Sequence, residues 1–467
     1  MWTPSQSMVA LWLCLALAYF SRALPSPPSS SQRTVDEAQI RFRSSSKYVR
    51  FDQLDACPKL SKRNRATSAK DVRPDDLRVV MALGDSITAG LLARGGPDGE
   101  KSRSRPDPQD SINTEKREYQ QNVFSSNLAS ASVRFPWRTR LGIPEIAEWR
   151  GVSYPIGLDD DAITFSTILQ HYTDRANETL VGGSRGRHPP LACLGMGIGV
   201  GCLPHPEEDG LNAAISGSVS EGLMSQVTDY LIPNIKEMNI KDEDWKYVNL
   251  GIGANDICAF CLTPNTTAFH LTGSPKQYAR NIKNAVNELR AHVPNIIVNI
   301  IGLFRVSAIH KLTLKDPYCQ TPGLPFPHLA LECNCALLPG PAGDLTRRKM
   351  DELGQAYDEA VHEIIREWEE EDDDTFGVTW QPGTAVDLEN YPITALSPID
   401  CFHPSEAAHQ RVGAGFWNRL TMDLEDKYTP IPWDEDGNED GLGGPLIRCL
   451  EEGDRIQVNS ITRSRST

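Results

Sequence analysis

The chain has 467 residues, of which 39% are hydrophobic and 23% are charged, so it can bury a large core as one domain or two. Its formal net charge is −15 at pH 7, from 47 basic and 62 acidic residues. An acidic chain of this kind does not bind nucleic acid or an anionic membrane surface through bulk charge, so we expect no nucleic-acid partner.

The N-terminal region opens on one apolar run, Met8–Phe20, which is short for a membrane-spanning helix. Small residues follow at the positions that a signal peptidase reads, which predicts a secretory signal peptide over residues 1–23. No later apolar stretch is long enough to cross a bilayer, and the polar C-terminal end predicts neither a transmembrane nor a GPI anchor. We therefore expect a secreted, extracellular protein.

The number of cysteines is consistent with an extracellular location. Of the eleven cysteines, ten remain once Cys14 is removed with the signal peptide, and an even number in a secreted chain favours disulfide bonds of open pairing. Cys258 and Cys261 together with Cys333 and Cys335 also have the spacing of a split zinc site, an interpretation that export disfavours. The chain has no P-loop, HExxH pattern or complete calcium loop, so we expect neither a metal nor an organic cofactor.

Composition divides the remaining chain into three parts. Residues 24–74 are rich in proline and serine and then basic. Residues 75–425 alternate strand and helix patterns and form the predicted main domain. Residues 426–467 form an acidic and polar C-terminal extension.

The first strong pattern of the main domain is the apolar run Val79–Leu83, which stops at Gly84-Asp85-Ser86. It predicts a buried strand, a tight turn and a serine at the start of the next helix. The hydroxyl of that serine is then expected at the carboxyl edge of a sheet, where open α/β sheets bind ligands. Its N–H is expected at a helix N-terminus, which favours negative charge. Ser86 is therefore a candidate nucleophile that also supplies an oxyanion donor.

A second serine lies in the pattern G-x-S-x-G, at Gly182–Gly186. That pattern needs a strand before the serine and a helix after it. Here Pro189 and Pro190 follow soon afterwards and cannot continue a helix. We interpret this segment as a flexible surface loop and Ser184 as a poor candidate nucleophile.

Strand and helix patterns alternate along the rest of the domain. Apolar runs predict strands at Tyr247–Ile252, Asn295–Leu303 and Phe376–Gln381. One helix is predicted to start at Ser274, an N-cap serine followed by proline, and to end before Pro294. A second is predicted over Asp344–Trp368. This alternation predicts a parallel sheet with helices on both faces.

Three further segments supply the groups that a serine nucleophile needs. Asn255 follows a predicted strand, and its amide can donate a hydrogen bond to an oxyanion; Leu211–Gly217 ends in a glycine that allows close backbone approach. Asp400 precedes His403 by three residues, so the carboxylate can hold one ring nitrogen while the other accepts the serine proton. Alone, this pair is more often a surface loop before a helix, and His409 is better explained by a structural role.

Taken in order, Ser86, Gly217, Asn255 and His403 show a resemblance to the SGNH/GDSL hydrolases, which are named for these four residue types. More narrowly, the chain resembles the phospholipase B branch of that family. The similarity runs from Leu77 to Leu420, and it departs at Leu158, where relatives tend to have glycine. The matching text is ALGDSITAG (Ala82–Gly90), EWRGVSYPIG (Glu148–Gly157), LNAAISGS (Leu211–Ser218), DWKYVNLGIGANDICAFC (Asp244–Cys261), the stretch Ser274–Ile301 and DCFHPS (Asp400–Ser405).

The resemblance implies a three-layer α/β/α fold of the flavodoxin-like type, with a mainly parallel sheet, for the hydrolase domain over residues 75–425. It implies that Ser86 is the nucleophile, that His403 is the general base and then the acid, and that Asp400 orients His403. It also implies an oxyanion hole formed by the N–H groups of Ser86 and Gly217 and the side chain of Asn255.

The resemblance further implies a secreted serine esterase, a carboxylic ester hydrolase that acts on phospholipids and lysophospholipids through an acyl-enzyme on Ser86. The residues alone indicate only that the substrate is a carboxylic ester. A neutral lipid or an acetylated carbohydrate therefore remains an alternative substrate. A secreted binding protein without activity is a third hypothesis, less favoured because all the family's residues are intact. Asn177 and Asn265 lie in N-glycosylation sequences. The oligomeric state is left open.

Overall fold

The central sheet is parallel and four-stranded, in the order β2-β3-β4-β5. Its strands are β2 (Leu77–Gly84), β3 (Trp245–Gly251), β4 (Ile296–Ile301) and β5 (Phe376–Gln381). The computed structural model describes residues 47–94, 147–188, 205–260, 273–314, 316, 319, 333–433, 444–458 and 461. Apart from Lys47, these belong to one unit, Tyr48–Thr467. The predicted signal peptide and Asn265 lie outside the described residues.

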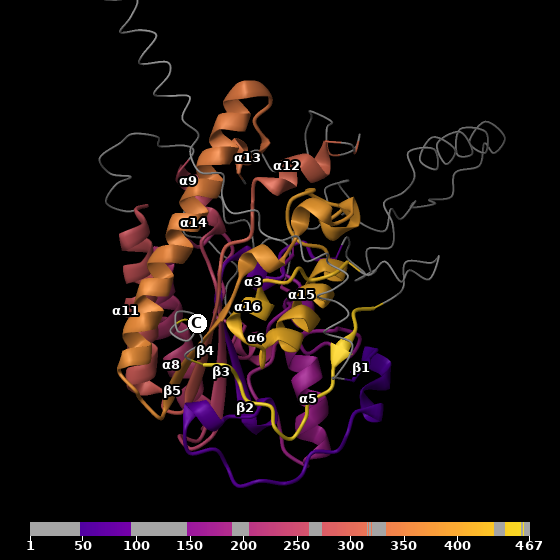
Figure 1. Cartoon of the computed structure of the whole chain (residues 1–467), viewed down its shortest axis with the longest axis vertical. Coiled ribbons are helices and arrows are strands. Elements are labelled where there is room, and N and C mark those ends of the chain that lie inside the picture. Colours follow the sequence, from indigo (N-terminus) through magenta and orange to yellow (C-terminus); the bar gives the residue numbers. More distant parts are fainter. Residues whose placement is uncertain are drawn as a thin grey trace, which may run out of the picture. The chain divides into compact units, whose positions relative to one another are not determined.

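Helices cover both faces of the sheet (Figure 1). One layer contains α8 (Ile232–Glu237), α11 (Pro275–His292) and α14 (Gly340–Glu370), and the other contains α5 (Phe165–Arg175) and α15 (Glu406–Arg419). This arrangement confirms the predicted three-layer α/β/α fold. The shorter α-helices are α3 (Ser86–Ala89), α6 (Pro206–Asp209), α7 (Leu223–Ser225), α9 (Ala254–Phe260), α12 (Ala308–Thr313), α13 (Asn334–Leu337) and α16 (Leu424–Lys427).

The connections contain short turns of other helix types. The π-helical turn is η7 (Gln226–Leu231). The 3-10 turns are η1 (Phe51–Ala56), η2 (Ala69–Asp71), η3 (Pro74–Asp76), η4 (Arg150–Val152), η6 (Ser220–Gly222), η8 (Gly383–Ala385), η9 (Leu388–Asn390) and η10 (Ile393–Ala395). Several of them follow the carboxyl ends of the strands, so they contribute to the site described below.

Alternate side chains of β2 enter two different hydrophobic cores. Val79, Met81 and Leu83 pack with residues of α8, α11 and α14. Val80 and Ala82 pack with residues of α5 and α15. Because successive side chains of a strand point to opposite faces, a sheet covered on both sides requires the nearly unbroken apolar run that the sequence contains.

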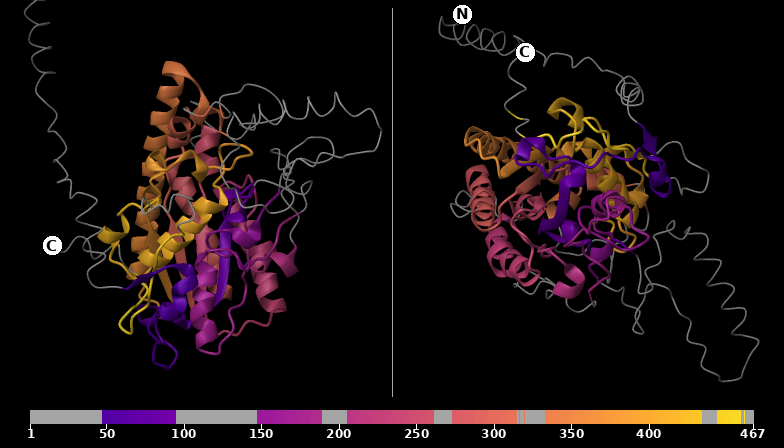
Figure 2. Two further views of the ribbon diagram at one scale, coloured as in Figure 1. Left: turned by 90° about the vertical axis from the view of Figure 1, so that its right-hand side faces the viewer. Right: turned by 90° about the horizontal axis from the view of Figure 1, so that it is seen from below.

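The two long helices of the first layer start and end close to their predicted limits. Ser274 caps α11 by accepting a hydrogen bond from the N–H of Gln277 at 3.2 Å, and Pro275 is the first helical residue. Helix α14 starts four residues before the predicted Asp344, after Pro339. Figure 2 shows that α14, in orange, runs alongside the sheet and beyond it.

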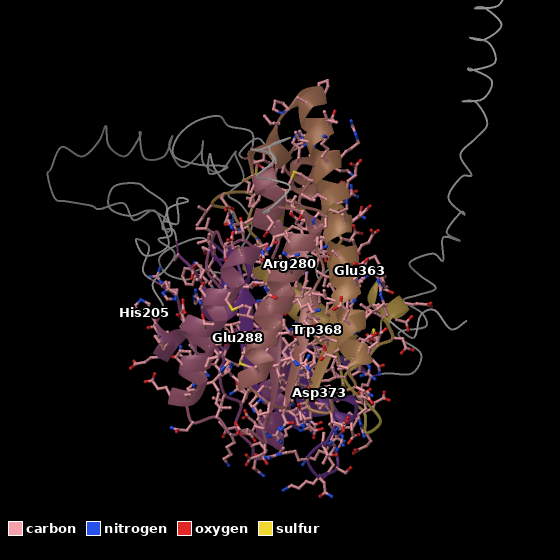
Figure 3. The ribbon with its side chains drawn as sticks, turned by 90° about the vertical axis from the view of Figure 1, so that its left-hand side faces the viewer. His205, Arg280, Glu288, Glu363, Trp368 and Asp373 are labelled. Atoms are coloured by element: carbon pink, nitrogen blue, oxygen red, sulfur yellow. A yellow bond between two sulfur atoms is a disulfide. The ribbon has the colours of Figure 1, made fainter. Side chains whose placement is uncertain are left out.

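The outer surface of this layer is charged. Figure 3 looks onto it, and Arg280 of α11 and Glu363 of α14 are exposed there. On the inner surface, Tyr278 of α11 stacks on Tyr357 of α14, with ring centroids 4.2 Å apart. In the part of the chain that the structure describes, no helix has the length and apolar character that crossing a membrane requires.

A second, two-stranded sheet joins the two segments outside the predicted main domain. Strand β1 (Tyr48–Val49) pairs antiparallel with β6 (Ile447–Arg448), and a disulfide links Cys57 to Cys449. Val49 and Ile447 are buried in the same core as α5. The division of the chain at residues 74 and 425 stays a prediction, and parts of both outer segments pack against the main fold.

Candidate active site

Ser86 is the first residue of α3 and follows the carboxyl end of β2 through a tight turn. The turn requires glycine at position 84, because a Cβ there would lie 2.3 Å from Oγ1 of Thr88. Asp85 caps the helix by accepting a hydrogen bond from the N–H of Ile87 at 3.0 Å. The side chain of Ser86 is therefore held at the edge of the sheet, as predicted, and the residue is 7% exposed.

Asp400 and His403 lie together on the loop before α15. Cys401, between them, has a φ of 55°, and this left-handed residue turns the chain back on itself. As a result, Oδ1 of Asp400 accepts hydrogen bonds from the N–H groups of Phe402 at 2.9 Å and His403 at 3.1 Å. The three-residue spacing between Asp400 and His403 thus corresponds to a closed turn, held by these two hydrogen bonds.

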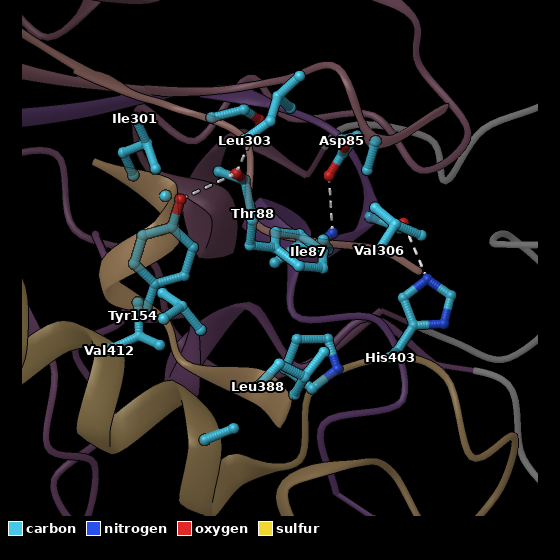
Figure 4. Close-up of a pocket in the computed structure, with 18 of the residues that line it drawn as sticks. Asp85, Ile87, Thr88, Tyr154, Ile301, Leu303, Val306, Leu388, His403 and Val412 are labelled. Atoms are coloured by element: carbon cyan, nitrogen blue, oxygen red, sulfur yellow. Dashed lines mark hydrogen bonds between the residues drawn. The ribbon is translucent and has the colours of Figure 1, made fainter. Parts of the chain in front are cut away.

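The structure brings these side chains to Ser86 across 317 positions of sequence. Oδ2 of Asp400 lies 2.5 Å from Nδ1 of His403, and Nε2 of His403 lies 2.9 Å from Oγ of Ser86. The dashed line at His403 in Figure 4 marks the second contact. With Nδ1–H donating to the carboxylate, Nε2 faces Oγ of Ser86 as the proton acceptor, which is the arrangement of a nucleophile, a base and an orienting acid.

The predicted oxyanion donors lie at the same end of the sheet. Asn255, at the start of α9, lines the same pocket as Ser86 and His403, and its Nδ2 donates to the carbonyl of Ser218 at 2.9 Å. Gly217 precedes Ser218 and has a φ of 81°, a conformation that favours glycine. Within the described ranges, neither the N–H of Ser86 nor that of Gly217 donates to a protein acceptor. The role of both groups as oxyanion donors stays a prediction.

Burial shifts the pKa of two groups beside this arrangement. Burial raises the pKa of the Asp85 carboxyl to about 7, against the opposing charge of His403. Burial lowers the pKa of His409 to about 3, and its Nδ1 accepts a hydrogen bond from the N–H of Tyr154 at 3.2 Å. His409 lies on α15, is 1% exposed and stays neutral at neutral pH, which fits the structural role predicted for it.

An apolar pocket opens from Ser86 and His403 (Figure 4). It runs along the carboxyl ends of the strands, from Ser86 after β2 to Gly383 after β5. Because neighbouring strands lie about 4.8 Å apart, the carboxyl ends of β2 and β5 are about 14 Å apart. The side chains along the pocket are mainly aliphatic and aromatic and include Ile87, Ile301, Leu303, Val306, Leu388 and Val412.

The interpretation of Gly182–Gly186 as a flexible surface loop is wrong at Ser184, whereas Arg185 and Gly186 are exposed. Ser184 is fully buried, its Oγ donates to the carbonyl of Asp209 at 2.7 Å, and it forms a bridge with Gly157. Gly182 serves close packing, since a Cβ there would lie 2.3 Å from the carbonyl oxygen of Val80. The hydroxyl of Ser184 is thus bonded to the main chain.

The disulfide interpretation of the cysteines is confirmed where the structure describes them. Cys258 pairs with Cys333, so these two do not serve as zinc ligands, and Cys319 pairs with Cys401. Cys261 lies outside the described residues. Among the described residues, no cluster of three or more histidines, cysteines or carboxylates has a geometry that could hold a metal ion.

One buried amide beside the nucleophile was not predicted. Gln226, in the π-helical turn η7, accepts from the N–H of Gly84 at 2.9 Å and donates to its carbonyl at 2.8 Å. The same Nε2 lies 3.2 Å from Oγ of Ser218. Gln226 therefore connects the turn before Ser86 with the segment that carries Gly217. No local pattern marks it, because its partners lie far away in sequence.

A comparison with known protein families finds a match over a large part of the chain. The model of the family described as GDSL-like Lipase/Acylhydrolase matches residues 158–416, which is more than half of the chain. The chain belongs to this family. The matched range includes Gly217, Asn255, Asp400 and His403, whereas Ser86 lies before it.

Individual proteins match the chain over a longer range than the family model does. The chain is 27% identical over 376 residues to "Phospholipase B1, membrane-associated" of Mus musculus, covering 78% of the chain and 20% of that relative. It is 24% identical over 372 residues to the protein of the same name in Homo sapiens, covering 77% of the chain and 20% of that relative. The chain thus spans about a fifth of the length of these relatives. Among solved structures, the acetylxylan esterase Axe2 of Geobacillus stearothermophilus aligns with 74% of the chain and 91% of its own, at 16% identity and a TM-score of 0.29.

Proposed function

We propose that the protein is a secreted serine esterase of the phospholipase B type, which hydrolyses fatty-acyl esters of phospholipids and lysophospholipids. The observation that carries the proposal is the continuous contact Asp400–His403–Ser86 at the mouth of an apolar pocket. The intact residues favour an enzyme over a binding protein that has lost activity. Secretion is supported by the N-terminal sequence pattern and by the disulfides.

In the proposed first step, Oγ of Ser86 attacks the ester carbonyl while Nε2 of His403 takes its proton. The carbonyl oxygen becomes an oxyanion that accepts hydrogen bonds from the N–H groups of Ser86 and Gly217 and from Asn255. Each such donor typically contributes about 3–4 kcal/mol to the transition state. Collapse of the intermediate expels the alcohol, to which His403 returns the proton, and leaves an acyl-enzyme.

In the second step, His403 deprotonates a water molecule that attacks the acyl-enzyme. The fatty acid leaves and Ser86 recovers its proton. Asp400 holds Nδ1–H of His403 and stabilises the imidazolium in both steps. The aliphatic path that starts at Ser86 can hold the acyl chain, and this favours a fatty-acyl ester over an acetyl ester.

One surface assignment accompanies the proposal. Asn177 is exposed and has a φ of 58°, in the turn after α5, so its side chain is accessible to a glycosylating enzyme. The extracellular location predicts that this site carries one. A mobility shift of the secreted protein on treatment with an N-glycosidase, absent in Asn177→Gln, tests the assignment.

The experiment that tests the function measures fatty-acid release from phosphatidylcholine and lysophosphatidylcholine by the secreted wild type beside Ser86→Ala. We expect release from both lipids by the wild type and a loss of at least about 10³-fold in the variant. Triacylglycerol and an acetylated xylan serve as comparison substrates. Activity on triacylglycerol or acetylated xylan alone shows that the assignment as an esterase is right and that the proposed substrate class is wrong. The assignment as an enzyme is refuted if the protein hydrolyses none of these esters and a fluorophosphonate does not label Ser86.

A further inference from the structure

A buried ion pair lies next to the segment that carries Gly217. Glu148 is fully buried and Arg150 is 3% exposed. Oε2 of Glu148 lies 2.8 Å from Nε of Arg150 and 2.7 Å from its second terminal nitrogen. Burial lowers the pKa of Arg150, and the carboxylates of Glu148 and Asp209 more than offset this, so its pKa is above the ordinary value and the guanidinium is charged.

Both members of the pair bond to the chain immediately before Gly217. The two terminal nitrogens of Arg150 donate to the carbonyls of Asn212 at 2.8 Å and Ala214 at 2.7 Å. The hydroxyl of Ser216 donates to Oε1 of Glu148 at 2.5 Å. Alternate residues 212, 214 and 216 are thus all fixed to the pair, and residue 217 follows directly.

The same stretch is also fixed to the helix of the nucleophile. The N–H of Trp149 donates to the carbonyl of Gly90, which ends α3, at 2.9 Å. Leu91 and Glu148 form an antiparallel bridge. The short stretch from 148 to 150 therefore connects the two parts of the chain that supply the backbone oxyanion donors, one at Ser86 and one at Gly217.

Stability alone does not explain this arrangement. Removing two charges from water costs about as much as their attraction returns, and apolar side chains of similar size often stabilise a fold more. A buried Arg–carboxylate fork does fix direction, because its hydrogen bonds are planar and paired. An oxyanion donor needs such precision, since its effect depends on a distance of about 2.7–3.1 Å to the transition state.

We propose that Glu148 and Arg150 are positioning residues that aim the N–H of Gly217 at the oxyanion, with the hydroxyl of Ser216 as the connecting link. This inference rests on the proposed function, because it assigns Gly217 an oxyanion. The ion pair touches neither substrate nor Ser86 and acts through the backbone of the segment 212–217.

The sharpest variant is Ser216→Ala, because it breaks the link to Glu148 and leaves the ion pair with Arg150 intact. Ser166→Ala is the matched control: Ser166 is fully buried and its hydroxyl donates to the carbonyl of Pro155 at 3.0 Å, remote from residues 212–217 in sequence. The substrate is p-nitrophenyl butyrate, which needs no lipid surface. Thermal unfolding of every variant is measured beside kcat and KM.

We expect Ser216→Ala to lower kcat about tenfold or more, with KM changed less than about twofold. Affinity for an alkyl boronic acid, which forms a tetrahedral adduct on the serine, falls by the same factor as kcat. Ser216→Thr, which keeps the hydroxyl, restores most of kcat. Ser166→Ala changes neither constant, even where it lowers the unfolding temperature.

A Ser216→Ala enzyme with the kcat of Ser166→Ala overturns the inference and leaves the esterase standing. So does a loss shared equally between kcat and substrate affinity, because that is the behaviour of a general structural defect. If the wild type is no faster than Ser86→Ala on this ester, the proposed function fails and the inference falls with it.

Discussion

Cys319 is joined by a disulfide to Cys401, the residue between Asp400 and His403. The closed turn that presents the acid and the histidine is therefore held from outside by a covalent bond to a segment 82 positions earlier. The left-handed backbone of Cys401, with a φ of 55°, is costly for a residue other than glycine, and a covalent restraint at that position helps to maintain it.

Removal of this disulfide should slow the reaction. In Cys319→Ala/Cys401→Ala the turn can relax, so we expect kcat to fall about tenfold or more, with a loss of about 2–4 kcal/mol in the free energy of unfolding. The matched control is Cys57→Ala/Cys449→Ala, which removes a disulfide between the outer segments. It should lose stability and keep kcat. Equal kcat values in the two double variants would show that the turn needs no external restraint.

Asp400→Asn tests the orienting role separately from the shape of the turn. The asparagine oxygen can still accept from the N–H groups of Phe402 and His403, so the loop is expected to keep its conformation. The amide cannot accept the Nδ1–H of His403, which favours the wrong tautomer. We expect kcat to fall about 10³-fold or more, with little change in the unfolding temperature. Retention of most activity would exclude the proposed triad.

Val412→Trp tests the assignment of the apolar pocket to the acyl chain. Val412 is half-buried on α15 and lines the pocket near Tyr154 (Figure 4). An indole there fills part of the path, so kcat/KM should fall about 30-fold or more for a palmitoyl ester and less than about threefold for a butyryl ester. Val412→Ala is the control and should keep both. Equal losses on the two esters would place the chain elsewhere.

Lys427 predicts a pH-dependent stability. It is fully buried and donates to Oγ1 of Thr379 at 2.8 Å; burial lowers its pKa to about 7, against the opposing effect of Asp423. Below pH 7 the native chain buries a charge. Between pH 7 and the unfolded pKa near 10.4, only the unfolded chain keeps the proton, so the stability of the wild type rises with pH.

Lys427→Met should therefore be more stable than the wild type at pH 6, by about 2–3 kcal/mol, and this advantage should shrink as pH rises towards 10. Urea unfolding at pH 6 and pH 9 measures the difference. Lys276→Met, at an exposed position of α11, is the control and should show no such dependence. An advantage that grows with pH contradicts the assignment.

Local patterns were sufficient for the elements that position the nucleophile. The apolar run to Gly84 predicted the strand and turn before Ser86, and the strand Phe376–Gln381 has the predicted limits. The cap at Ser274 was equally clear, since the serine and the proline after it are neighbours in sequence. In each case the physical cause lies within a few residues, so a single sequence can reveal it.

Contacts between distant segments were beyond such patterns. Ser184 was assigned to a surface loop because Pro189 and Pro190 follow it, whereas Gly182 allows the segment to pack closely against β2. The link between Glu148 and Ser216 joins residues 68 positions apart, and neither has a neighbour that marks it. In a sequence, a charged residue that is buried to orient a backbone segment cannot be distinguished from a charged residue on the surface.

The pairing of Leu91 with Glu148 has a practical consequence. The N–H of Leu92 also donates to the carbonyl of Ala147 at 2.9 Å, so residues 91–92 and 147–148 lie side by side although they are far apart in sequence. This is the geometry at which a foreign domain with adjacent termini can be grafted. A fluorescent reporter grafted between Arg94 and Ala147 would then be joined to the stretch that we propose aligns the two oxyanion donors. Its emission would then report on the alignment of the catalytic centre from outside it.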